Sequence, residues 1–134
     1  MERKFKRAIS SLDDIFQFIG EFSRREGVDE SLVFTINLVV EELFTNMVKY
    51  NRQNSNKIAI DLKLKKNDLL IHLTDFDVEP FDITKADKVD TGKTLQERKV
   101  GGLGIHLVKK MVDKIDYEYR DRQSKIILTK HLEN

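Results

Sequence analysis

The chain has 134 residues, 40% hydrophobic and 35% charged, with a formal net charge of +1 at pH 7. This length suits one domain with a real hydrophobic core, so we expect residues 1–134 to form a single domain. The near-neutral charge gives no basis for binding nucleic acid or an anionic membrane. The absence of cysteine excludes disulfides, thiolate metal sites and cysteine nucleophiles. The N-terminus lacks the apolar core of a signal peptide, and no run approaches ~18 apolar residues, so we expect a cytoplasmic protein without a transmembrane helix.

The first part of the chain predicts one short strand and two helices. Residues 2–9 alternate charged and apolar side chains, as in a short edge strand. Ser10 or Ser11 can cap a helix whose apolar residues repeat at steps of three and four, and Gly27 would close it. After the capping residue Asp29, apolar residues cover most of the circumference of a longer helix, which predicts a buried, central position.

The second part predicts two hairpins separated by a long segment and a helix. Alternating patterns over residues 58–65 and 69–74, joined by a polar turn, predict antiparallel strands. The charged segment 75–100 is long for a loop in a compact domain, and such loops are usually functional. Apolar periodicity predicts a helix over 103–115, and residues 126–129 close the last hairpin. This order predicts an α+β fold, a two-layer sandwich with helices on one face of a mostly antiparallel sheet.

Two polar residues interrupt the apolar surface of the longer helix. Glu42 and Asn46 are four residues apart, so they share one face of the helix. A carboxylate and an amide are costly to bury without partners. Their oxygens suit Mg²⁺ together with phosphate, and the carboxylate can also orient or deprotonate a hydroxyl. The simpler interpretation is a solvated stripe with a hydrogen bond inside the helix.

Two further features stand on either side of the long charged segment. Asp75, at the exit of the hairpin, can either cap a turn or accept a hydrogen bond from an exocyclic amine such as that of adenine. On the other side, Gly101, Gly102 and Gly104 run directly into the apolar-periodic helix. Such a loop allows close approach of the backbone, and the helix N-terminus attracts anions, usually phosphate. A tight turn explains the glycines equally simply.

In this order, the pieces resemble the GHKL ATP-binding domains, the histidine-kinase-like ATPase fold shared by gyrase, a heat-shock chaperone, histidine kinases and mismatch-repair ATPases. Residues 40–46 are similar to the asparagine box of that family, residues 75–82 to its first glycine box and residues 101–108 to its second. The resemblance covers nearly the whole chain. The small size, the Thr-Asn pair, the Pro-Phe-Asp ending and the closing hairpin look most like bacterial anti-sigma-factor serine kinases.

The resemblance implies a site for ATP and Mg²⁺ and gives each polar residue a role. Asn46 would coordinate the Mg²⁺ that bridges the ATP phosphates. Glu42 would act as the general base or orienting carboxylate for an attacking serine hydroxyl. Asp75 would bond the adenine amino group, residues 83–100 would form the lid, and Thr129 on the last strand would sit near the base.

The same resemblance assigns the glycine loop and the partners. Gly101, Gly102 and Gly104, with Ile105 at the start of the helix, would let the backbone cradle the phosphates. The kinase relatives transfer the γ-phosphoryl group to a serine of a small antagonist protein, bind a sigma factor in the other state, and are usually homodimers. An antagonist protein, a sigma factor or similar regulator, and a second copy of the chain are therefore the expected partners.

One position departs from the family pattern. The first glycine box normally has glycine two residues after the aspartate, and this chain has Asp77. At ~4 Å and an effective dielectric constant near 20, like charges repel by roughly 4 kcal/mol before screening, a cost that largely disappears if Asp77 turns outward. Two hypotheses stay open: an active kinase, and a non-catalytic regulatory module of the same fold with weak or lost nucleotide binding. The ATPase half of a split histidine kinase ranks below both, since no phosphoacceptor-histidine helix precedes the domain.

Overall fold

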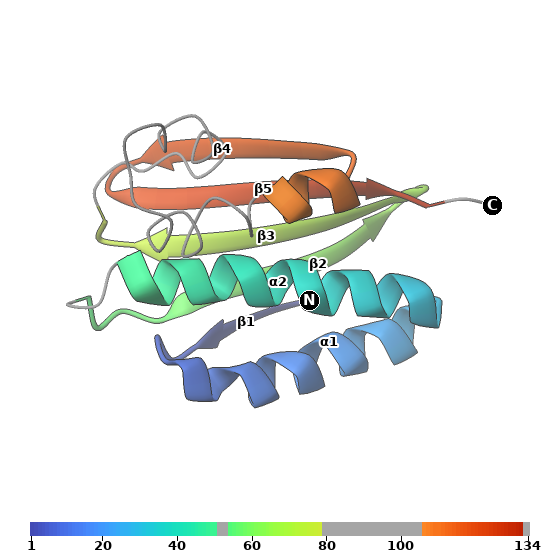
Figure 1. Cartoon of the computed structure of the whole chain (residues 1–134), viewed down its shortest axis with the longest axis horizontal. Coiled ribbons are helices and arrows are strands. Elements are labelled where there is room, and N and C mark those ends of the chain that lie inside the picture. The colour runs from blue at the N-terminus through green and yellow to red at the C-terminus, as the bar shows by residue number, and fades with distance from the viewer. Residues whose placement is uncertain (51–53, 79–105, 133–134) are drawn as a thin grey trace.

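The computed structural model describes residues 1–50, 54–78 and 106–132. Its elements follow in the order β1 (Glu2–Phe5), the 3-10 turn η1 (Ile9–Ser11), α1 (Leu12–Glu26), α2 (Glu30–Tyr50), β2 (Ile58–Lys65), β3 (Asp68–Phe76), β4 (Lys114–Arg120) and β5 (Gln123–His131). Residues 106–111 are also helical. The strands form one layer and the helices form a second layer across it (Figure 1).

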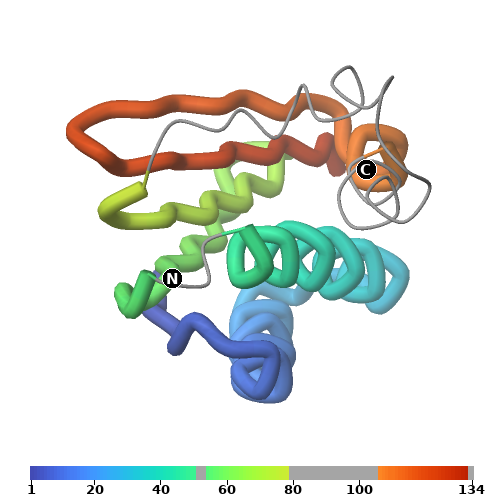
Figure 2. The backbone as a smooth tube through the Cα atoms, turned by 60° about the vertical axis from the view of Figure 1, so that its left-hand side comes forward, coloured from blue at the N-terminus to red at the C-terminus, as the bar shows by residue number. Residues whose placement is uncertain are grey.

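The sheet has the strand order β1-β2-β3-β5-β4, and every neighbouring pair is antiparallel. Both long helices and the helical segment 106–111 lie on the same side of it (Figure 2). The predicted α+β two-layer sandwich is therefore confirmed. The first strand is at the sheet edge, as predicted, but it ends at Phe5 because the chain then turns into η1.

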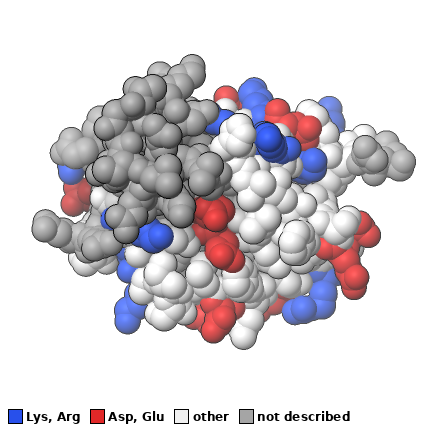
Figure 3. Space-filling view, viewed as in Figure 1, with Lys and Arg blue, Asp and Glu red and all other residues white. Residues whose placement is uncertain are grey.

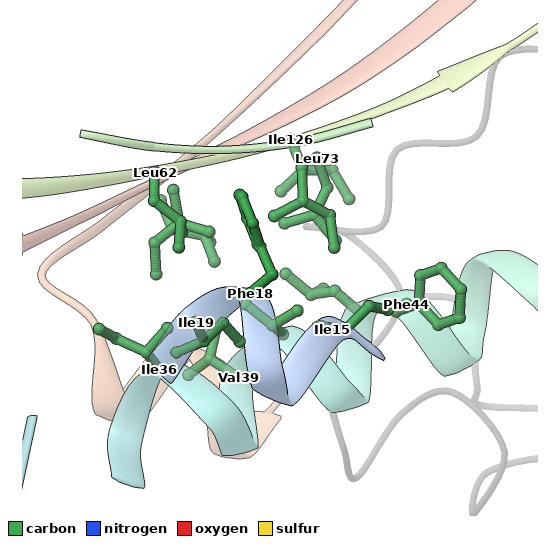
Figure 4. Close-up of a cluster of buried hydrophobic side chains, with 14 of the residues drawn as sticks. Ile15, Phe18, Ile19, Ile36, Val39, Phe44, Leu62, Leu73 and Ile126 are labelled. Carbon is green, nitrogen blue, oxygen red and sulfur yellow. The ribbon is translucent and has the colours of Figure 1, made fainter. Parts of the chain in front are cut away.

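The core lies between the helices and the inner face of the sheet. Figure 4 shows three kinds of contributor: α1, α2 and the strands, whose side chains point toward one another. The labelled residues are all at most 2% exposed: Ile15, Phe18, Ile19, Ile36, Val39, Phe44, Leu62, Leu73 and Ile126. Burying a large apolar side chain stabilises the fold by about 1.5–3 kcal/mol, so this cluster dominates the folding free energy.

Helix α2 is the most apolar helix of the part that the structure describes. By length and composition alone it could cross a membrane. Its apolar side chains instead form the centre of the core, where Ile36, Val40 and Leu43 are at most 1% exposed. This burial confirms the predicted central position and accounts for the composition of the helix. On the face seen in Figure 3, acidic and basic side chains are intermixed, in keeping with the near-neutral net charge.

One predicted helix boundary is wrong, and one predicted capping residue stands in its place without making the capping hydrogen bond. The helix predicted over 103–115 ends at residue 111, and its first residues lie outside the described part. Ile115 belongs to β4, opposite Leu128, because the apolar residues from that point alternate with a period of two. At the start of α1, the Ser11 hydroxyl donates to the Lys6 carbonyl (2.7 Å) and makes no cap hydrogen bond to the helix.

The C-terminus of α1 follows the predicted pattern. Gly27 adopts φ 68°, in the left-handed region that side chains disfavour, and its N–H bonds the Ser23 carbonyl. A β-carbon there would meet no atom within 4 Å, so any cost of substitution comes from the backbone alone. Gly20, inside α1, has ordinary helical geometry, and a β-carbon would touch only the flexible end of Arg24 at 3.4 Å.

These two glycines give a matched test of the helix end. We expect Gly27→Ala to lower the free energy of unfolding by about 1 kcal/mol, because alanine resists the left-handed conformation. Gly20→Ala should raise it by about 0.5–1 kcal/mol through helix propensity. Urea denaturation followed by circular dichroism measures both, and equal effects of the same sign would contradict this account of the helix end.

Candidate functional site

Two of the predicted site residues, Asn46 and Asp75, lie where the end of α2 meets the end of β3. Asn46 and Asp75 are each only 2% exposed, although both are polar. Glu42 is half-buried one turn before Asn46 on α2. Buried polar side chains need hydrogen-bond partners. The partners of each of these side chains therefore indicate its role.

Arg7 connects the two elements. Its Nη1 donates to the Met47 carbonyl (3.0 Å) and to Asp75 Oδ2 (3.4 Å), and its Nη2 donates to Asp75 Oδ1. Its Nε donates to the Asn56 carbonyl (3.2 Å). The Arg7 and Asp75 side chains are both only 3% exposed, so this is a buried, two-pronged ion pair. Since Met47 directly follows Asn46, Arg7 also brings Asp75 close to the Asn46 turn of α2.

Asn46 has an unused polar atom. Within the described residues, its Nδ2 is buried and makes no hydrogen bond. An unsatisfied buried polar group costs about 1–3 kcal/mol, so this N–H₂ is available to an acceptor other than the described residues. Asn37 Oδ1, earlier on the same helix, is in the same situation within that part of the chain. Each of these amides has a glutamate four positions away, Glu41 for Asn37 and Glu42 for Asn46. Asn46 differs in that Arg7 joins its turn of the helix to Asp75. Its amide oxygen and the Glu42 carboxylate are the hard donors that Mg²⁺ accepts.

Asp77 stands at the position where the family pattern has glycine. Its φ is 56°, so the position requires the left-handed backbone that glycine adopts without strain. Its side chain is 67% exposed and accepts from Arg122 Nε at 2.8 Å. Asn54 Nδ2 donates to the carbonyls of Phe76 (2.7 Å) and Asp77 (3.1 Å) and so fixes the turn. Aspartate is one of the few residues that tolerate this conformation, and its charge faces solvent.

The placement of Thr129 near the base is wrong. In the β3–β5 register, Thr129 lies opposite Leu70, whereas Asp75 lies opposite Ser124. Side chains alternate between the faces of a strand, and Leu70 is five positions from Asp75, so Thr129 is on the other face of the sheet. Ser124, 8% exposed, is the residue of β5 that lies directly opposite Asp75 on the inner face.

The remaining predicted site residues lie outside the part of the chain that the structure describes. They are the lid segment 83–100, Gly101, Gly102, Gly104 and Ile105.

The histidines do not form a metal site in the described residues, where no group of three or more His, Cys, Asp or Glu side chains could hold an ion. Burial lowers the pKa of His72, against the opposing effect of Asp61. The hydrogen bond that His131 Nδ1 donates to the Asp68 carboxylate raises the pKa of His131. Both residues are away from Asp75 and Asn46: His72 is on the outer face of β3, and His131 is at the far end of β5.

Two of the residues that shape this site had no signal in the sequence. Arg7 stands in a run of alternating charges near the N-terminus, and its partner Asp75 is 68 positions away. Ser124 follows the turn of Asp121 and Arg122, whose φ values of 54° and 61° fit a two-residue hairpin. Only the strand register reveals that Ser124 adjoins Asp75.

A comparison with known families agrees with this geometry. Residues 5–130 match the model of the histidine kinase-like ATPase domain. The chain belongs to this family. The match spans every described element except the first residues of β1 and the last residue of β5.

Similar members of the histidine kinase-like ATPase family are bacterial protein kinases. The serine/threonine-protein kinase BtrW of Bordetella bronchiseptica is 24% identical over 120 residues, which cover 88% of this chain and 84% of that protein. The serine-protein kinase RsbW of Halalkalibacterium halodurans is 25% identical, covering 86% of this chain and 72% of that protein. RsbW of Listeria monocytogenes is 23% identical, covering 81% and 71%.

A solved structure shares the fold. A chain in the crystal structure of the SiaB–SiaC complex from Pseudomonas aeruginosa superposes with a TM-score of 0.69. The superposition covers 97% of this chain and 87% of that chain, at 11% sequence identity. This similarity shows a common fold of the histidine kinase-like ATPase type.

The left-handed turn at Asp77 leads to a test with paired variants. Asp77→Gly and Asp77→Ala both remove the exposed ion pair with Arg122, which is worth at most about 1 kcal/mol. Alanine keeps the strained backbone and glycine relieves it, so we expect the glycine variant to be more stable than the alanine variant by about 1 kcal/mol. Thermal or urea unfolding measures this difference.

Because the Asp77 side chain already faces solvent, we also expect Asp77→Gly to bind ATP no better than the unmodified chain. A gain of about tenfold or more in affinity, a difference of about 1.4 kcal/mol, would show that this carboxylate opposes the nucleotide.

Proposed function

We propose that this chain is a cytoplasmic, ATP-dependent protein-serine kinase of the anti-sigma type. The observation that carries the proposal is the pairing of a buried amide, Asn46, with the Glu42 carboxylate one turn away, at the point where α2 meets Asp75. The relatives named as serine kinases support the same activity. The fold alone would not support a kinase activity, since one fold serves many functions.

The proposed chemistry depends mainly on positioning and on charge. Asn46 and neighbouring phosphate oxygens would hold a Mg²⁺, which when bound neutralises the phosphates. The Glu42 carboxylate orients the attacking serine hydroxyl and accepts its proton. The serine oxygen then forms a bond to the γ-phosphorus of ATP as the bond to the bridging β-phosphate oxygen breaks, and ADP leaves with that electron pair.

The environment of Glu42 suits this role. It is half-buried, and among the described residues no hydrogen bond or ion pair engages its carboxylate. A carboxylate without a structural partner is available to a substrate hydroxyl. Asn46, the proposed Mg²⁺ ligand, lies one helical turn after Glu42. The metal and the attacking hydroxyl would therefore meet on one face of α2.

The proposed protein substrate is a small antagonist protein that presents a serine. The relatives named RsbW and BtrW are kinases of proteins, and the structural neighbour was solved in a complex with a second protein. By the same resemblance, a sigma factor or similar regulator would be the alternative partner, and the chain would act as a homodimer. The outcome would be partner switching controlled by phosphorylation.

A non-catalytic regulatory module remains the second candidate, and one observation favours it. Both carboxylate oxygens of Asp75, the residue assigned to the adenine amino group, already accept hydrogen bonds from Arg7. In that case the chain would retain the fold and bind its partner, with nucleotide binding weak or lost.

The role of Asn46 can be tested with a control on the same helix. We expect Asn46→Ala to abolish the part of ATP affinity that depends on Mg²⁺, because the amide oxygen is the proposed ligand. Asn37→Ala removes a comparable amide from α2 and should leave ATP affinity unchanged. Calorimetric titration with and without Mg²⁺ distinguishes them, and equal Mg²⁺-dependent affinity in the Asn46 variant would exclude it as a ligand.

The role of Glu42 requires a measurement of transfer. Glu42→Gln keeps the size of the side chain but cannot accept a proton, so we expect phosphorylation of the antagonist serine to fall by roughly 10²–10⁴-fold. ATP affinity should change little. Single-turnover transfer from radiolabelled ATP gives the rate, and Glu41→Gln, the preceding residue, is the control. A variant that transfers at the normal rate would rule out Glu42 as the base.

A further inference from the structure

Arg7 forms an ion pair with Asp75, whose carboxylate the family resemblance assigns to the adenine amino group. Its Nη1 and Nη2 reach Oδ2 and Oδ1 of Asp75 respectively, so both oxygens accept from one guanidinium. With both side chains only 3% exposed, the pair is almost fully withdrawn from water. In such surroundings a charged pair is strongly coupled, and breaking it by removing one partner is costly.

Three protein segments hold the guanidinium in place. Arg7 also donates to the carbonyls of Met47, on α2, and Asn56, before β2. Four of its five N–H groups are therefore used inside the protein. A guanidinium fixed in this way has little freedom to swing aside for a ligand. An amino group that approaches Asp75 meets a carboxylate whose charge is already matched.

We propose that Arg7 is the specificity-determining residue of the nucleotide site: by matching the charge of Asp75 in a buried pair, it removes the charge-assisted hydrogen bond that would select the 6-amino group of the base. The inference rests on the proposed nucleotide-binding function. In the unmodified chain, the triphosphate and the purine ring provide the affinity, and the amino group provides none. Weakening the Arg7–Asp75 pair restores discrimination by Asp75.

The test compares ATP with purine riboside triphosphate, which lacks only the 6-amino group. For the unmodified chain in saturating Mg²⁺, we expect equal dissociation constants within about threefold by calorimetry. For Arg7→Gln, shown to be folded by circular dichroism, we expect at least about tenfold preference for ATP, since a hydrogen bond to a charged group discriminates on this scale. Arg3→Gln is the control: Arg3 is an exposed arginine paired with Glu21 at the surface, and its loss should leave the ratio near one.

Arg7→Lys provides a second variant if the glutamine variant does not fold. Lysine keeps the buried charge but lacks the two-pronged geometry, so one carboxylate oxygen is released and a smaller preference for ATP should emerge. A preference for ATP above about threefold in the unmodified chain overturns the inference, and so does a folded Arg7 variant whose ratio stays at one. If none of these folded proteins binds either triphosphate, the proposed nucleotide-binding function itself fails. That result is distinct from the two above, which overturn only the inference about Arg7.

Discussion

The buried ion pair between Arg7 and Asp75 is the interaction on which the polar end of this domain depends. Two charges withdrawn from water are stable only when each has its partner and its remaining hydrogen bonds. Arg7 meets this condition by bonding two backbone carbonyls as well as the carboxylate. The pair therefore determines how the N-terminal segment, the end of α2 and the end of β3 meet. The proposed nucleotide site lies at this junction.

Helix α2 forms part of the core and carries two residues of the proposed site, Glu42 and Asn46. Its apolar residues pack under the sheet and form the centre of the core, which fixes the helix rigidly. The same rigidity presents Asn46 and Glu42 at a constant distance and angle. A site on a packed helix is more precise than one on a loop, which suits chemistry that depends on positioning. The cost is a buried amide with an unused polar atom, Asn46 Nδ2, in the described part of the chain.

Local patterns predicted most of the fold because they depend on neighbours in sequence. Gly27 ended α1 as its position indicated, and alternation located the hairpin of β2 and β3. Ile115 was placed in a helix because it fits the three- and four-residue spacing as well as the two-residue alternation of β4. Pairing with Leu128 decided between them. The Arg7–Asp75 pair joins distant parts of the chain, so no local pattern could predict it.

The site was predictable in part for the same reason. Asn46 and Asp75 stand in motifs that can be read from the sequence, and the fold places them near one another through Arg7. The family resemblance assigns Thr129 on the last strand to the base, and the register puts it on the other face of the sheet from Asp75. The outward direction of Asp77 depends on Arg122, a turn residue of a different hairpin. Such contacts follow from the register of the sheet and not from any motif.

The most direct test of the central claim is a nuclear magnetic resonance titration of the isotopically labelled chain with ATP, followed at the side-chain amides. We predict that the Asn46 amide resonances shift on addition of ATP only when Mg²⁺ is present, and that those of Asn37 stay in place. Saturation by Mg²⁺ and ATP with an unchanged Asn46 amide, or no binding by a folded chain, would contradict the assignment of this site.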